Sequence, residues 1–215
     1  MSTLTSTFAT AFPGQVANLI TAGRVVLLFL ATAFAVSGDA MLAWVAVPLA
    51  FVALVMDWLD GYLARRLGCE SKVGGVLDIV GDRIAENVWW VVFAWLHVIP
   101  LWVPIVVLSR GFVTDAIRSC ALTRGFTAFG ESTMMKSRLG FALVASRVSR
   151  ATYGTAKVVA FVLLFSLNAA QQMSGLTPAF LSGLEMVAVA ATYLTVALCV
   201  IRAIPVVTAA KRVVV

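Results

Sequence analysis

Charged residues are scarce in this chain. Lys, Arg, Asp and Glu make up 12% of its 215 residues, whereas soluble domains carry about 25%. The apolar fraction is 61% and the mean hydropathy is +1.00. These values place the chain in the membrane class. Nucleic-acid binding is a poor alternative, because the basic residues flank hydrophobic runs and do not line a soluble face.

Cysteine and histidine are also few. Cys69, Cys120 and Cys199 are an odd number without metal-ligand spacing, so we expect buried or reduced thiols. The single histidine, His97, lies near the expected extracytoplasmic end of a span and is assigned no role. Residues 1–17 contain no Lys or Arg, and no cleavage site follows a short apolar core. We therefore expect no cleavable signal peptide.

Six hydrophobic segments have about the length, roughly 20 residues, that a helix needs to cross a bilayer. They occupy residues 17–37, 42–64, 76–97, 101–123, 152–171 and 182–204. We expect an all-α, polytopic membrane protein with six transmembrane helices around a cytosol-facing polar cavity. Residues 1–16 would form a juxtamembrane segment, residues 17–204 the membrane domain, and residues 205–215 a cytosolic tail. Pro205 is expected to close the sixth segment.

The basic residues are distributed unevenly along the chain. The connections near 38–41, 97–103 and 172–181 contain no Lys or Arg, and all 16 basic residues lie at or near the other connections and helix ends. Short basic loops stay in the cytosol. We therefore expect both termini and the connections 65–75 and 124–151 on the cytosolic side of an inner or plasma membrane.

Four aspartates lie where the second segment ends and the third begins. On a helix, 100° per residue places each of two sets on one face: Asp57, Asp60, Gly61, Ala64 and Arg65 in the second segment, and Gly74, Asp78 and Asp82 in the third. The eight residues between Arg65 and Gly74 suffice for a hairpin. The two faces are therefore expected to meet near the cytosolic end.

The negative charge of these four carboxylates must be compensated inside a membrane. One carboxylate in a membrane helix costs on the order of 2.5 kcal/mol or more, and four close together also repel one another. Divalent cations remove both costs, and oxygen ligands suit Mg²⁺, Mn²⁺ or Ca²⁺. Two such ions would bridge a diphosphate and neutralise its leaving group.

The same residues resemble the signature of the CDP-alcohol phosphotransferase family: D-x-x-D-G-x-x-A-R, eight residues, then G-x-x-x-D-x-x-x-D. All eight fixed positions are present. The resemblance implies that Asp82 is the general base and that two ions of Mg²⁺ or Mn²⁺ bind to four residues, Asp57, Asp60, Asp78 and Asp82. It further implies a homodimer and CDP binding by Asn18, Gly61, Ala64, Arg65 and Gly74. Asn18 opens an Asn-x-x-Thr-x-x-Arg run common in the family, and a helix-capping role is equally open.

A second basic group follows in the fourth and fifth segments. Arg110, Thr114 and Arg118 recur on one helical face, and the next basic residues along the chain include Arg147, Arg150 and Lys157. Together they would form a pocket for the phosphate of an acceptor alcohol. Alternatively, they mark the cytosolic side and contact anionic lipid headgroups.

The region after Ser109 resembles phosphatidylglycerophosphate synthases, although Gly111 stands where an acidic residue is expected. The resemblance implies transfer of a phosphatidyl group from CDP-diacylglycerol to a small, phosphorylated alcohol with release of CMP. Glycerol 3-phosphate is the first choice of acceptor and inositol phosphate the second. An ion transporter is the non-enzymatic alternative, because intramembrane carboxylates often mark ion paths.

Other polar and aromatic residues are given structural roles. Glu86 is expected to pair with Arg83 or to line the cavity, and Asp115 to pair with Arg118 three residues later. The tryptophans around the third segment are interpreted as belt or packing residues: Trp89, Trp90, Trp95 and Trp102.

Overall fold

The computed structural model describes residues 22–67, 72–123 and 140–214, with side chains for all of these except 57–67, 72–79, 82, 145 and 211–214. Nearly all of the described residues are helical, and no strand occurs among them. The fold is therefore all-α, as the composition predicted. Asn18, Cys69 and Arg124 lie outside the described residues.

Each predicted hydrophobic segment overlaps a described helix. In chain order the described elements are the helix Ala22–Ala35, α2 (Ala40–Leu67), α3 (Lys72–Trp95), α4 (Trp102–Thr123), the π-helix η1 (Phe141–Ala145), α6 (Arg147–Gln171) and α7 (Pro178–Val214). Within the described ranges, Arg147–Gln171 and Pro178–Ala210 are long and apolar enough to cross a membrane, while Ala22–Ala35 and Ala40–Met56 are shorter apolar helices.

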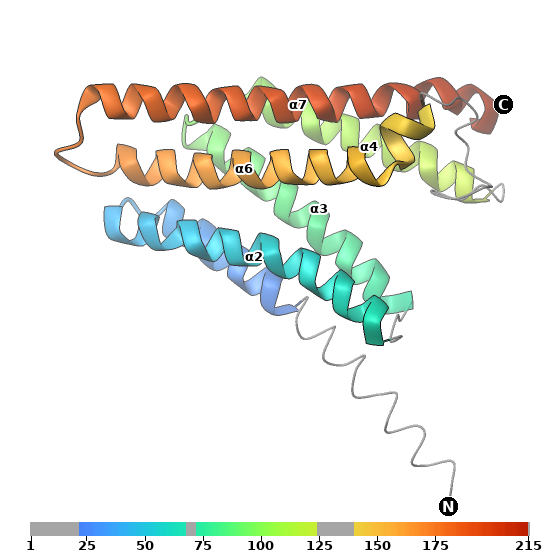
Figure 1. The fold of residues 1–215 in the computed structure, drawn as a ribbon, viewed down its shortest axis with the longest axis horizontal. Coiled ribbons are helices and arrows are strands. Elements are labelled where there is room, and N and C mark those ends of the chain that lie inside the picture. The colour runs from blue at the N-terminus through green and yellow to red at the C-terminus, as the bar shows by residue number, and fades with distance from the viewer. Residues whose placement is uncertain (1–21, 68–71, 124–139, 215) are drawn as a thin grey trace, which may run out of the picture.

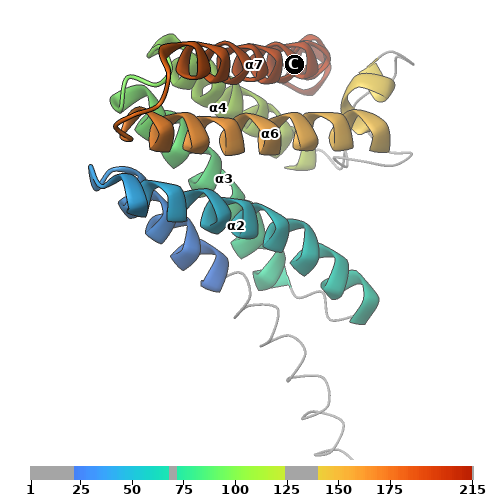
Figure 2. The ribbon, with the colours of Figure 1, turned by 60° about the vertical axis from the view of Figure 1, so that its left-hand side comes forward.

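The helices form an antiparallel bundle (Figure 1). The helix α7 packs along both α6 and α4, while α2 packs on α6 and α3 contacts α4. Figure 2 shows α2 and the helix before it lying below α6 and α7, with α3 passing behind them. The connections between Ala35 and Ala40 and between Gln171 and Pro178 lie at one end of the bundle, which is on the left in Figure 1. The starts of α3 and α6 and the end of α7 lie at the opposite end.

Local capping explains where several helices begin. The Asp39 carboxylate accepts hydrogen bonds from the backbone N–H groups of Met41 and Leu42, at 2.8 and 3.0 Å, and so caps α2. The Ser146 hydroxyl accepts one from Ser149 N–H at 3.1 Å and caps α6. The turn before α2 contains Gly38 at φ +76°, a conformation that glycine adopts without strain.

Aromatic rings join α3 to α6 in the core. Trp89 lies edge-on to Phe161 and Phe165, with ring centroids 5.1 Å apart in both pairs. Phe93 meets Phe165 at 4.8 Å. Trp89 is thus a packing residue, whereas Trp95 is 67% exposed. These contacts fix α3 against α6 and therefore fix the helix that carries Asp82.

The face of α2 buried in the core consists of alanines. Ala46, Ala50 and Ala53 recur at helical spacing and are almost completely buried. Small side chains let membrane helices approach closely. The position of α2 is therefore set by close helix packing, with no large side chain between it and the core on this face.

Pro205 does not end the last helix. The structure has α7 continuing through Pro205 to Val214, so the expected closure of the sixth helical segment at this residue is wrong. A proline removes one backbone donor, but a long helix packed against neighbours tolerates that loss. Pro48 likewise lies inside α2.

Candidate functional site

The two halves of the aspartate motif lie on helical backbone, as predicted. Asp57 to Arg65 fall in the last three turns of α2, and Gly74 to Asp82 in the first three turns of α3. Four residues link Leu67 to Lys72, so the end of α2 and the start of α3 lie close together, at the lower right of Figure 1. The side chains of the eight motif residues lie outside the description, so their roles remain predictions.

Arg24 reaches α3 directly beside the motif. Its side chain is buried, with 3% exposure, and its guanidinium lies against Gly81. A Cβ added at Gly81 would lie 2.7 Å from Arg24 Nη2. Only glycine leaves this space without displacing the arginine. The sequence offered one signal for this contact, the Asn-x-x-Thr-x-x-Arg run that ends at Arg24.

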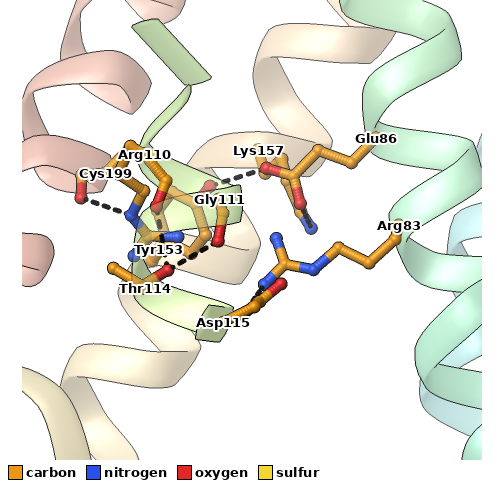
Figure 3. Close-up of polar contacts among 9 residues, drawn as sticks. All are labelled: Arg83, Glu86, Arg110, Gly111, Thr114, Asp115, Tyr153, Lys157 and Cys199. Carbon is orange, nitrogen blue, oxygen red and sulfur yellow. Dashed lines mark hydrogen bonds and ion pairs between the residues drawn. The ribbon is translucent and has the colours of Figure 1, made fainter. Parts of the chain in front are cut away.

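Glu86 stands one helical turn after Asp82 and is buried, with 8% exposure. Tyr153 donates its hydroxyl to Glu86 Oε1 at 2.8 Å, and Lys157 Nζ lies 3.3 Å from Glu86 Oε2 (Figure 3). A buried carboxylate requires such partners. Both partners come from α6, so Glu86 ties the motif helix to the start of α6.

Arg83 pairs with Asp115 on α4 and not with Glu86. Its Nη2 lies 2.7 Å from Asp115 Oδ1, and Figure 3 shows the pair bridging α3 and α4. Gly111 lies one turn before Asp115, and a Cβ there would be 3.4 Å from Arg83 Nη1. The expected pair of Asp115 with Arg118 is a longer-range attraction. An acidic residue was expected at position 111, where the chain has glycine. The carboxylate that pairs with Arg83 instead belongs to Asp115, one helical turn after Gly111.

Arginines from three helices gather next to this network. Arg202 on α7 lies close enough to Arg110 and Arg118 on α4 and to Arg150 on α6 to interact electrostatically with each of them, and Arg110 interacts in the same way with Arg118. Arg110 Nε donates to the carbonyl oxygen of Cys199 at 3.1 Å. Among the described side chains, the acids Glu86 and Asp115 are each engaged in an ion pair with another residue. Basic groups therefore outnumber acidic ones among the side chains described in this region.

Arg202 was not among the predicted site residues. Its Nη1 donates to Ser149 Oγ at 2.6 Å, and its guanidinium lies 5.4 Å from the centroid of the Tyr153 ring. Arg202 Nε is buried without a hydrogen-bond partner. The sequence placed Arg202 at the end of a span, and no local pattern connected it to residues about 50 positions away.

The other predicted acceptor residues differ in their surroundings. Thr114 is fully buried, and its hydroxyl donates to the carbonyl groups of Arg110 and Gly111, at 3.0 Å each. Arg147 is exposed. Lys157 is held by Glu86. The structure thus places Arg110, Arg118 and Arg150 each near Arg202 and gives Thr114 and Lys157 other partners.

The described side chains contain no group of three or more His, Cys, Asp or Glu residues that would hold a metal ion. This absence does not extend to the motif aspartates, whose side chains lie outside the description. Their chemistry still fits a hard divalent cation: four carboxylates, spaced by three residues on α2 and by four on α3, on two helix ends close together.

Comparison with known proteins gives a family and several relatives. The family model described as CDP-alcohol phosphatidyltransferase matches residues 14–201. A Bacillus subtilis protein named CDP-diacylglycerol–glycerol-3-phosphate 3-phosphatidyltransferase is 31% identical over 67 residues, which cover 31% of this chain and 35% of the relative. A Pseudomonas fluorescens protein of the same name is 37% identical over 81 residues, covering 36% and 41%.

A third relative is a cardiolipin synthase (CMP-forming) from Streptomyces coelicolor. It is 41% identical over 56 residues, covering 26% of each protein. The chain thus matches between about a quarter and two fifths of the length of these curated relatives.

Proposed function

Because the chain belongs to the CDP-alcohol phosphatidyltransferase family, we propose that it transfers the phosphatidyl group of CDP-diacylglycerol to glycerol 3-phosphate and releases CMP. The names of the Bacillus and Pseudomonas relatives support this donor and this acceptor. The observation that carries the choice of a phosphorylated acceptor is the arginine cluster of Arg110, Arg118, Arg150 and Arg202.

The acceptor phosphate suits this cluster on physical grounds. Guanidinium groups bind phosphate through paired, charge-assisted hydrogen bonds. Among the described side chains, Glu86 and Asp115 engage Lys157 and Arg83, while Arg110 and Arg202 donate to uncharged groups, the Cys199 carbonyl and the Ser149 hydroxyl, so a phosphate would supply the opposite charge. Arg202 is added to the predicted acceptor-binding residues. Thr114, Arg147 and Lys157 are proposed to act at the margin of the arginine cluster. A neutral acceptor such as glycerol would leave this charge uncompensated.

The transfer is an attack of an alcohol on phosphorus. Asp82 takes the proton from the acceptor hydroxyl, whose oxygen forms a bond to the phosphorus of the phosphatidyl group. The bond from that phosphorus to the bridging oxygen breaks, and CMP leaves with the electron pair. Gly61, Ala64 and Gly74 leave room for the nucleotide near the backbone, and Arg65 binds a phosphate oxygen. Asn18 would contact the same nucleotide.

Members of this family generally use divalent metal ions. In this chain two ions of Mg²⁺ or Mn²⁺ would be held by Asp57, Asp60, Asp78 and Asp82. When bound, the metal supplies charge neutralisation for the diphosphate and the departing CMP. The spacing of these residues on α2 and α3 supports the assignment, because each pair shares one helix face.

The protein is proposed to be an integral membrane homodimer with six crossings, both termini and the site in the cytosol. The apolar helices and the separation of the basic helix ends from the Lys- and Arg-free connections support this arrangement. No nucleic acid takes part. The ion-transport alternative loses support, because the family match covers residues 14–201.

Two other acceptors place a phosphate next to an alcohol. Inositol phosphate is the second choice from the sequence. The Streptomyces relative is a cardiolipin synthase, for which the corresponding acceptor chemistry is a glycerol hydroxyl beside a lipid phosphate. All of these acceptors would present an anionic phosphate to the arginine cluster, a monoester of about −2 in glycerol 3-phosphate and inositol phosphate and a diester of about −1 in the lipid, so a direct comparison is needed to separate them.

The test is CMP release by purified protein in detergent, with CDP-diacylglycerol, Mg²⁺ or Mn²⁺ and one acceptor at a time. The acceptors are glycerol 3-phosphate, glycerol, inositol phosphate and phosphatidylglycerol. We expect turnover with glycerol 3-phosphate, none with glycerol, and complete loss on chelation of the metal. Arg118→Ala should raise the acceptor KM about tenfold or more, because hydrogen bonds to charged groups contribute about 1.5–3 kcal/mol.

Asp82→Asn separates binding from chemistry. The variant should still bind CDP-diacylglycerol, measured as a shift in melting temperature, and should lose turnover. Near-normal turnover would remove Asp82 as the base. Turnover with inositol phosphate or phosphatidylglycerol alone would keep the reaction and replace the acceptor, and equal turnover with glycerol would contradict the phosphate-binding role of the arginines.

A further inference from the structure

Tyr153 contacts residues from two other helices through two different parts of its side chain. Its hydroxyl donates to Glu86 on α3 at 2.8 Å. Its ring lies 5.4 Å from the guanidinium of Arg202 on α7. Figure 3 shows Tyr153 between Glu86 of α3 and the Arg110–Cys199 contact. One side chain therefore touches both the helix that carries Asp82 and the arginine cluster.

The burial of Glu86 holds its hydrogen bond with the Tyr153 hydroxyl in place. Glu86 is buried, so it retains its charge only if its partners stay in place. The other partner, Lys157, lies 3.3 Å from Glu86 Oε2 and 5.7 Å from the centroid of the Tyr153 ring. The three residues thus hold one another, and the first turn beyond Asp82 is fixed to α6.

The contact with the Tyr153 ring stabilises the position of Arg202. Arg202 lies in the field of Arg110, Arg118 and Arg150, and like charges in one cluster push each other apart. The face of an aromatic ring attracts a guanidinium. Ser149 accepts from Arg202 Nη1 at 2.6 Å and fixes the guanidinium from another side. The Tyr153 ring therefore holds Arg202 in the cluster before any anion arrives.

We propose that Tyr153 is a positioning residue that sets the separation between the acceptor phosphate, held by Arg202, and the reacting hydroxyl, held near Asp82. The ring supports phosphate binding, and the hydroxyl aligns α3 through Glu86. The site would therefore select acceptors in which hydroxyl and phosphate lie at one fixed spacing. This inference rests on the proposed function.

The two parts of the side chain are separable by substitution. Tyr153→Phe keeps the ring and removes the hydroxyl, so kcat should fall about tenfold, the loss expected for one hydrogen bond to a charged group, while the acceptor KM stays within about twofold. Tyr153→Leu removes the ring as well. Its KM for glycerol 3-phosphate should rise about threefold to thirtyfold, the range for a cation–π contact. The KM for CDP-diacylglycerol should not change in either variant.

A further variant acts as the control. Tyr193→Phe alters a tyrosine on α7 that stacks on Trp102 at 5.4 Å, and should match the wild type. Calorimetric binding of glycerol 3-phosphate, without donor, should weaken in Tyr153→Leu and not in Tyr153→Phe.

The outcomes distinguish this role from general stability. Equal losses in Tyr153→Phe and Tyr153→Leu, or a KM change shared by donor and acceptor, would overturn the positioning role while wild-type turnover keeps the proposed function. If Tyr153→Leu does not fold, an unchanged kcat in Tyr153→Phe alone overturns it. Absence of wild-type CMP release with every acceptor would overturn the proposed function and this inference together.

Discussion

At the scale of single residues, Gly81 shows how a missing side chain positions a large one. The Gly81→Ala methyl group would lie 2.7 Å from Arg24 Nη2, so the buried guanidinium must move away from the turn that carries Asp82. Because the clashing atom is the far end of a flexible side chain, the arginine can shift at a cost near the lower end of the usual range of about 1–3 kcal/mol. We expect CMP release, measured with saturating donor and acceptor, to fall about fivefold, the factor that corresponds to about 1 kcal/mol.

Gly183 on α7 provides the matched control. No atom lies within 4 Å of a Cβ placed there, and alanine is favoured over glycine in a helix by about 1 kcal/mol. Gly183→Ala should leave turnover unchanged and preserve or raise the melting temperature. Equal activity in the two alanine variants would show that Arg24 does not need its place against Gly81.

At the level of residues, the sequence predicted which residues share a helix, but it did not predict which side chains form ion pairs. Helical periodicity correctly placed the aspartates on the ends of α2 and α3, and it grouped Arg110 with Arg118. The charge pattern also assigned Lys157 to the acceptor pocket, but it did not indicate that Lys157 pairs with Glu86, 71 positions earlier. Which carboxylate neutralises which cation depends on how helices cross, and no local pattern encodes this.

At the scale of helices, the crossing of α3 and α6 depends on Phe165. Its ring meets Trp89 at 5.1 Å and Phe93 at 4.8 Å. Replacing a buried phenylalanine by alanine costs about 3–5 kcal/mol. Phe165→Ala should therefore lower the melting temperature in detergent strongly, and turnover should fall with it, because α3 carries Asp82.

Phe180, near the start of α7, is 52% exposed and serves as the comparison. Phe180→Ala should shift the melting temperature much less. Similar shifts in both variants would mean that the aromatic crossing contributes no more than a surface ring. The long apolar segments predicted the helices themselves well, whereas the end of α7 was missed because the packing of neighbours on a long helix outweighs the usual effect of Pro205.

At the scale of the whole molecule, the bundle has a basic end and an end whose connections lack Lys and Arg. This predicts opposite labelling of two positions in a cysteine-free background. Ser174→Cys, between α6 and α7, should react with a membrane-impermeant thiol reagent on intact cells. Thr123→Cys, at the end of α4, should react only after the cells are opened. Both positions are exposed.

The reverse pattern would place the candidate site on the outer side of the membrane and contradict the cytosolic assignment. Labelling of both positions on intact cells would contradict a span for α6, the long helix between them. The uneven distribution of basic residues made this orientation predictable from sequence, because charge counting does not depend on how the helices pack.

The alanine face of α2 has a mechanical consequence. Ala53 is 4% exposed in this packed core, so a larger residue there would press α2 away from its neighbours. Asp57 lies only about 6 Å further along the axis of the same helix and would shift with it. The position of the aspartates on α2 thus depends on helix packing one turn away, at alanines that carry no reactive group.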